Sequence, residues 1–147
     1  MKNTWILVAD SGRARLFEAG AADARFTEIE DFANPEGRAG ARGISRDRLP
    51  TVNESANSAR HAIEPHTTPS EKVTDRFASE LGGVLERGRV QNRFDRLILV
   101  APARFLGALR AHLDAPLRNC VSGEIRRNLT QLPIEQIRAR LPAHLLH

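Results

Sequence analysis

The chain has 147 residues, the size of one domain, and its single cysteine excludes an internal disulfide. It carries 22 basic and 18 acidic residues, a net charge of +4 and a pI near 10.5. No apolar run approaches the roughly 18 residues of a membrane span, and the N-terminal run Trp5–Ala9 is shorter than the roughly 7–15 residues of a signal-peptide core. We therefore expect one cytoplasmic domain over residues 1–147, without membrane insertion.

Three consecutive strands are predicted at the start of the chain. The apolar run Thr4–Ala9 is typical of a buried central strand, and a second strand, Arg13–Ala19, follows directly after the turn Asp10-Ser11-Gly12. A third strand is expected over Arg25–Asp31. Asp10, Ser11 and Gly12 form a candidate functional turn, because Asp10 lies where a buried strand opens. A carboxylate at this position also serves as an acceptor for the N–H groups of a turn.

A long polar segment, residues 33–67, shows neither helical nor strand periodicity. Glycines and prolines interrupt it throughout, and a loop of this length is usually functional or disordered. We expect residues 36–62 to be mobile unless a partner holds them, because little apolar area is present to offset the entropy of ordering.

A helix is predicted after this loop. Thr68 to Glu71 have the pattern of a capping box with proline at the first helical position. We expect the helix to end at Gly88. Its apolar face consists of Val73, Phe77, Leu81, Val84 and Leu85, which recur at helical spacing.

Two further strand–helix units complete the chain. The expected strands are Leu97–Ala101, whose continuous apolar run suits a strand buried on both faces, and Val121–Arg126. Pro102 begins the helix between them, and the last helix extends from Pro133 to Pro142. The order β-β-β-loop-α-β-α-β-α predicts an α/β fold with a five-stranded mixed sheet whose first strand is interior. This is the ribonuclease H-like order of elements, found also in the middle domain of archaeal and eukaryotic peptide-release factors.

Hydrolysis with metal ions on such a fold requires several carboxylates that converge on two divalent ions. Asp10 stands where the first carboxylate would lie, and Asp75 or Glu80 offers a second. The end of the fourth strand carries no acid, and Arg104 follows it as a cation that would repel metal ions. A hydrolase based on Asp10 is therefore the least favoured function, and we predict no catalytic residue, metal site or cofactor.

Arginine dominates the basic residues, since two of the 22 are lysine and 20 are therefore arginine. This bias follows either from GC-rich coding or from the affinity of guanidinium groups for phosphate. Strand alternation places Arg13 and Arg15 on one face. Aromatic residues are 5% of the chain, which disfavours base stacking and favours contacts to the nucleic-acid backbone; a solvated, salt-bridged surface is the alternative. The candidate phosphate- or RNA-binding residues are Arg13, Arg15, Arg38, Arg42, Arg46, Arg48, Arg126 and Arg127.

Four segments, in this order, resemble the bacterial host attachment protein family. They are WILVADSGRARLF at residues 5–17, NPEGR at 34–38, LILVAPARFLG at 97–107 and GEIRRNLT at 123–130. The resemblance implies a role in the attachment of bacteria to host cells, and it brings no established catalytic residues. The family is remotely related to the release-factor middle domain, which implies association with RNA or the ribosome. We therefore expect a non-enzymatic binding protein that contacts RNA or the ribosome through arginines. The alternative is a protein–protein interaction component of an attachment pathway.

Overall fold

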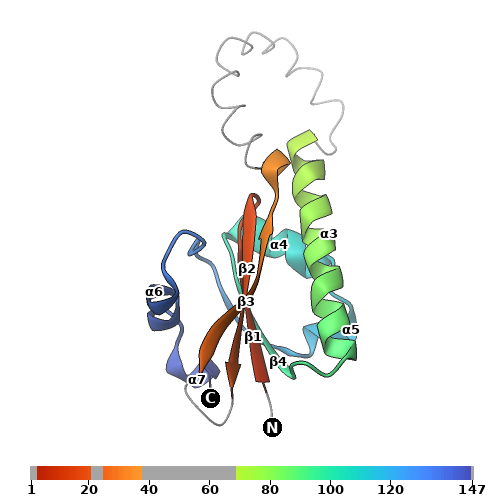
Figure 1. The fold of residues 1–147 in the computed structure, drawn as a ribbon. Coiled ribbons are helices and arrows are strands. Elements are labelled where there is room, and N and C mark those ends of the chain that lie inside the picture. The colour runs from red at the N-terminus through yellow and green to blue at the C-terminus, as the bar shows by residue number, and fades with distance from the viewer. Residues whose placement is uncertain (1–2, 21–24, 38–68, 147) are drawn as a thin grey trace, which may run out of the picture.

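The computed structural model describes residues 3–20, 25–37 and 69–146, which form a five-stranded mixed sheet with helices on both faces (Figure 1). The strands lie in the order β3-β2-β1-β4-β5. β1 pairs antiparallel with β2 and parallel with β4, so the predicted mixed sheet with an interior first strand is confirmed. The strand bounds are β1 (Asn3–Ala9), β2 (Arg13–Gly20), β3 (Phe26–Ala33), β4 (Arg96–Val100) and β5 (Val121–Ile125).

The central strands are buried on both faces because their apolar side chains alternate between two cores. Trp5, Leu7 and Ala9 of β1 pack in one core, whereas Ile6 and Val8 pack in the other. β4 divides its side chains in the same way. An unbroken apolar run is therefore what these positions require.

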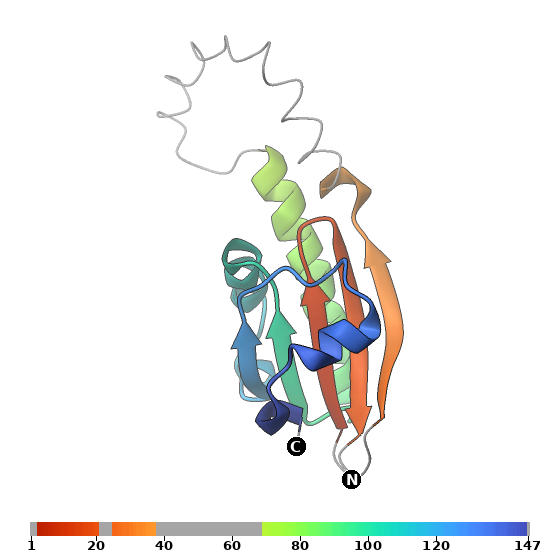
Figure 2. The ribbon, with the colours of Figure 1, turned by 90° about the vertical axis from the view of Figure 1, so that its left-hand side faces the viewer.

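The helices on the two faces differ in length. The first face is covered by α3 (Pro69–Val90), α4 (Ala103–Ala111) and α5 (Ala115–Arg118). The second face is covered by α6 (Ile134–Ala139) and α7 (Ala143–Leu146), both much shorter than α3, as Figure 2 shows. None of the helices within the described ranges combines the length and the apolar character needed to cross a membrane.

The predicted end of the first long helix at Gly88 is wrong. α3 continues to Val90, and Gly88 is a buried position inside it. A Cβ atom on Gly88 would lie 2.5 Å from Cη2 of Trp5 and 3.1 Å from Cε1 of Phe94. Glycine is present here because the helix backbone packs directly on the stacked rings of Trp5 and Phe94, whose centroids are 4.6 Å apart.

We expect Gly88→Ala to lower the free energy of unfolding by about 1–2 kcal/mol, since the added methyl group overpacks this contact by more than the gain in helix propensity. Gly107→Ala in α4 is the matched control, because a Cβ atom there meets nothing within 4 Å. The control should stabilise the protein by up to about 1 kcal/mol in urea unfolding. A stabilising effect of Gly88→Ala would contradict the packing described here.

Two short helices were not predicted from the sequence. α5 and α7 have four residues each, which is too short for a helical period to appear.

The segment predicted as a loop over residues 33–67 begins differently from the prediction, because β3 continues to Ala33 and residues 35–37 form a helical turn. The rest of that loop lies outside the described residues, together with the predicted cap Thr68 and the candidate arginines Arg38, Arg42, Arg46 and Arg48.

Candidate functional site

Asp10 organises the turn between β1 and β2. Its Oδ1 atom accepts the backbone N–H groups of Gly12 at 2.8 Å and Arg13 at 2.9 Å, and its own N–H donates to the Arg13 carbonyl at 2.8 Å. These hydrogen bonds satisfy the backbone polar groups of the turn with partners inside the turn itself. The predicted role of Asp10 as an acceptor for turn N–H groups is confirmed.

The second oxygen of Asp10 binds the segment that follows β5. Its Oδ2 atom accepts hydrogen bonds from Nδ2 of Asn128 at 3.1 Å and from the hydroxyl of Thr130 at 3.0 Å, and Oδ1 of Asn128 shares that hydroxyl at 2.8 Å. Thr130 is fully buried, and its N–H donates to Oδ1 of Asn128 at 3.1 Å. Four donors therefore surround one carboxylate, and charge-assisted bonds of this kind are the stronger ones in proteins. They fix the ends of β1 and β5 relative to each other.

The end of β3 contacts the same turn from the other side. Asn34 donates its side-chain amide to the Ser11 carbonyl at 2.8 Å and its backbone N–H to the Gly12 carbonyl at 2.9 Å. Gly37 packs so closely that a Cβ atom would overlap the Ser11 carbonyl oxygen. Residue 37 must therefore be glycine for the helical turn to approach the β1–β2 turn.

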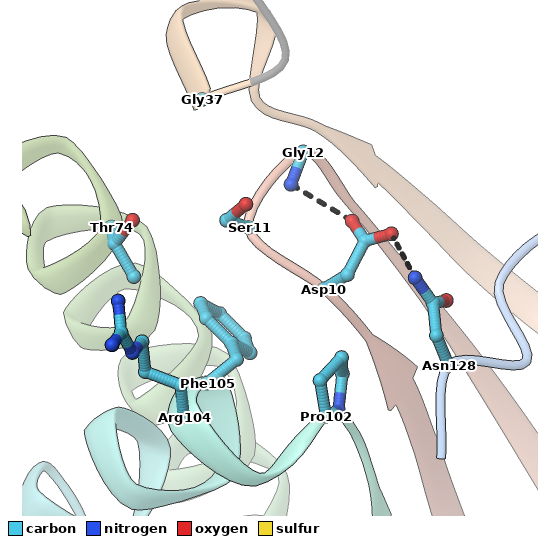
Figure 3. Close-up of a pocket in the computed structure, with 9 residues that line it drawn as sticks. All are labelled: Asp10, Ser11, Gly12, Gly37, Thr74, Pro102, Arg104, Phe105 and Asn128. Carbon is cyan, nitrogen blue, oxygen red and sulfur yellow. Dashed lines mark hydrogen bonds between the residues drawn. The ribbon is translucent and has the colours of Figure 1, made fainter. Parts of the chain in front are cut away.

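A pocket of about 450 Å³ opens beside this turn, at the ends of β1 and β4 (Figure 3). We call this side of the sheet, where the parallel strands β1, β4 and β5 end, the carboxyl edge. Ligands of open α/β sheets bind at this location, where neighbouring strands connect in opposite directions. The pocket is lined by Asp10, Ser11, Gly12, Gly37, Thr74, Pro102, Arg104, Phe105 and Asn128.

Arg104 supplies positive charge to the pocket. It lies in the first turn of α4, its side chain is exposed, and in residues 3–20, 25–37 and 69–146 it has no hydrogen bond or ion pair. α4 begins after Pro102 without a side-chain cap, so the positive end of its dipole also favours an anion here. Arg126 and Arg127 directly follow β5, are exposed, and likewise form no ion pair with the described part of the chain. Three arginines that have no ion pair with residues 3–20, 25–37 and 69–146 therefore lie at the carboxyl edge.

Arg13 and Arg15 lie on one face, as predicted, but they are engaged within the protein. Arg13 donates to Asp31 at 2.9 Å, and this hydrogen bond raises the pKa of the guanidinium. Arg15 is 8% exposed and forms a two-bond pair with Glu28, at 3.0 Å and 2.8 Å.

The remaining donors of Arg15 reach the carbonyls of Thr130 at 3.0 Å and Leu132 at 2.6 Å. Arg13 also contacts the Thr130 carbonyl, at 3.4 Å. The Arg15 guanidinium is enclosed and donates to four acceptor atoms of the protein, which disfavours the predicted phosphate contact of this residue. Both arginines instead fasten the segment after β5 to the sheet.

The carboxylates suggested as partners of Asp10 in hydrolysis lie elsewhere. Asp75 pairs with Nε2 of His112 at 2.8 Å, and neither Asp75 nor Glu80 lines the pocket. Within the described ranges, no group of three or more His, Cys, Asp or Glu side chains converges in a way that suits a metal ion. The oxygens of Asp10 are directed to four donors of the protein itself.

The sequence interpretation missed the roles of Asn34, Asn128, Thr130 and Arg104. The sequence did hold a signal for these residues, because each of the four lies in one of the segments that carried the family resemblance. Those segments are far apart in the sequence, yet each contributes residues to this one pocket.

These features define an α/β protein with a five-stranded mixed sheet and, at the carboxyl edge, a pocket lined by one carboxylate, Asp10, and one guanidinium, Arg104. Residues 5–141 match the family described as "Protein required for attachment to host cells", and the chain belongs to that family. The resemblance seen in the sequence is thereby confirmed.

Comparison with solved structures shows the same fold in a protein described as "Archaeal protein", with a TM-score of 0.52 at 10% sequence identity. The match covers 97% of this chain and 34% of the archaeal one, so this chain spans about a third of that protein's length. No curated protein matches the chain.

Proposed function

We propose that this member of the host attachment family is a non-enzymatic binding protein that holds RNA phosphates at its carboxyl edge. The observation that supports this most is a set of three exposed arginines there that have no ion pair within the described part of the chain, Arg104, Arg126 and Arg127. Guanidinium groups bind phosphate oxygens through paired N–H donors. Arg15 is enclosed and paired with Glu28, and Arg13 is paired with Asp31, so we assign both arginines to holding this edge together.

Recognition through phosphates rather than bases follows from where the aromatic rings lie. Five of the aromatic residues are buried, namely Trp5, Phe17, Phe77, Phe94 and Phe105, and the other two, Phe26 and Phe32, are half-buried against the cores. The part of the chain that the structure describes therefore presents no large stacking platform, which readers of single-stranded RNA normally use. We expect structured RNA to bind with little sequence preference.

The strand order supports a finer assignment of the fold. An antiparallel β1–β2–β3 meander followed by β4 and β5, parallel to β1, is the ribonuclease H-like arrangement expected from the sequence. On this proposal the domain is similar to the release-factor middle domain, and its RNA partner includes the ribosome in the cytoplasm.

A protein partner in an attachment pathway is the second candidate, and the description of the family favours it. A complex that survives ribonuclease and is insensitive to salt, captured from a lysate, would support this candidate. A complex that ribonuclease abolishes would support RNA.

Replacing Arg126 and Arg127 together with glutamine should weaken RNA binding without changing sequence preference. Each lost phosphate contact reduces counterion release, so the slope of log K against log salt should fall by roughly one per arginine. The measurement is an RNA titration between about 50 and 200 mM salt.

The matched control is Arg87→Gln with Arg93→Gln, which removes the same charge from exposed positions at the opposite end of the sheet. The control should leave the slope close to that of the wild type. An equal fall in both double variants would show that net charge, rather than the carboxyl edge, drives binding.

A further inference from the structure

We infer that the pocket binds a phosphate monoester carried on a small organic group, with Arg104 as the phosphate-binding residue. The inference goes beyond backbone contacts with RNA, and it rests on the proposed function only where the monoester is the end of an RNA chain. Two sources share this chemistry: a free mononucleotide and a 5′-phosphorylated RNA end.

The size of the pocket points to a small ligand. Its volume of about 450 Å³ lies in the lower part of the range of roughly 300–1,000 Å³ that is typical of ligand pockets. A nucleic-acid backbone bound by surface arginines needs no such cavity. The turn at the end of β1, the helical turn at residue 37, α3 and the first turn of α4 border this open pocket, and its volume suits one nucleotide unit.

The polar groups of the pocket favour a phosphate. The Arg104 guanidinium is unpaired, and the hydroxyls of Ser11 and Thr74 form no hydrogen bond with residues 3–20, 25–37 and 69–146. A phosphate monoester offers three terminal oxygens to these donors, one more than a carboxylate or a backbone phosphodiester offers. The positive end of α4 adds to the attraction.

The carboxylate of Asp10 does not disqualify the site. Both of its oxygens accept hydrogen bonds from the β1–β2 turn and from the segment after β5, so the carboxylate is oriented toward these donors. Figure 3 shows Asp10 and Asn128 on one side of the pocket and Thr74, Arg104 and Phe105 on the other. The phosphate is therefore expected on the Arg104 side.

Apolar atoms of Pro102 and Phe105 line the pocket next to Arg104. They offer a surface for the organic group of the ligand while the phosphate contacts the guanidinium. Inorganic phosphate alone would leave this surface uncovered, so it should bind more weakly than a mononucleotide.

The probe for the pocket is AMP, with adenosine as the matched compound that lacks phosphate. At about 50 mM salt, where phosphate contacts are strongest, AMP should shift the amide NMR signals of Ser11, Gly12 and Gly37. Adenosine should bind at least about tenfold more weakly. Arg104→Gln should weaken AMP binding by about tenfold or more. The control is Arg87→Gln, which should leave AMP binding unchanged. Arg87 lies some 20 Å from Thr74 along α3, at 1.5 Å per residue.

A second arm compares RNA of one sequence with a 5′-phosphate and with a 5′-hydroxyl. Tighter binding of the phosphorylated RNA, with competition by AMP, supports the RNA end as the source. Binding of AMP without any RNA binding keeps the pocket assignment, makes a free nucleotide the ligand and overturns the proposed function. If RNA binds equally well with either 5′ group and AMP does not bind, the pocket assignment is overturned and the proposed function stands. AMP binding that is unaffected by Arg104→Gln overturns the role of Arg104.

Discussion

Asp10→Ala is expected to lower the free energy of unfolding by about 3 kcal/mol, since hydrogen bonds to a charged group contribute about 1.5–3 kcal/mol each and part of this loss is recovered through water. The substitution removes the acceptor for two backbone N–H groups of the turn, for Asn128 and for the fully buried Thr130 hydroxyl. Urea unfolding of the wild type and the variant measures the difference.

Asp114→Ala is the matched control for Asp10→Ala. Asp114 is exposed at the N-cap of α5, and its side chain makes no capping hydrogen bond. Its removal should therefore change stability by less than about 0.5 kcal/mol. A loss for Asp10→Ala no larger than that of the control would show that the four contacts of Asp10 contribute little.

Arg15→Ala is expected to cost about 2–3 kcal/mol. Breaking a fully buried ion pair costs about 3–5 kcal/mol, and partial exposure of Glu28, at 28%, reduces that figure through solvent screening. The change also leaves the carbonyls of Thr130 and Leu132 without this donor. The segment after β5 should loosen, which faster hydrogen exchange of the Thr130 amide would reveal.

The pair of Arg110 with Glu124 provides the comparison for Arg15. It has the same two-bond geometry, at 3.1 Å and 2.8 Å, but its side chains are 46% and 29% exposed. Arg110→Ala should therefore cost clearly less stability than Arg15→Ala, because solvent screens an exposed pair. Equal losses for the two arginine variants would mean that the enclosure of Arg15 has no energetic consequence.

Local sequence patterns predicted those parts of the fold that depend on neighbours along the chain. The apolar run of β1 indicated an interior strand, and the sequence Asp10-Ser11-Gly12 indicated a turn closed by a carboxylate. The apolar spacing from Val73 to Leu85 indicated α3. Each of these depends on residues close in the sequence, where alternation and helical periodicity are reliable guides.

Contacts over long sequence separations could not be predicted in the same way. Asn128 and Thr130 lie 118 and 120 residues from Asp10, and Arg15 reaches a carbonyl 117 residues away. Alternation showed that Arg13 and Arg15 share a face, but it could not show that the segment after β5 covers that face. Gly88 was misjudged for the same reason, because the ring of Trp5 that requires a glycine comes from a distant strand.

Binding of RNA phosphates at the carboxyl edge is tested most directly by titrating the isotope-labelled wild-type protein with structured RNA at about 50 mM salt. The predicted result is a set of amide NMR shifts concentrated at Gly12, Gly37, Arg104 and residues 126–128, with the end of α3 near Val90 unaffected. Shifts confined to residues away from this edge, or no association at this salt concentration, would contradict it.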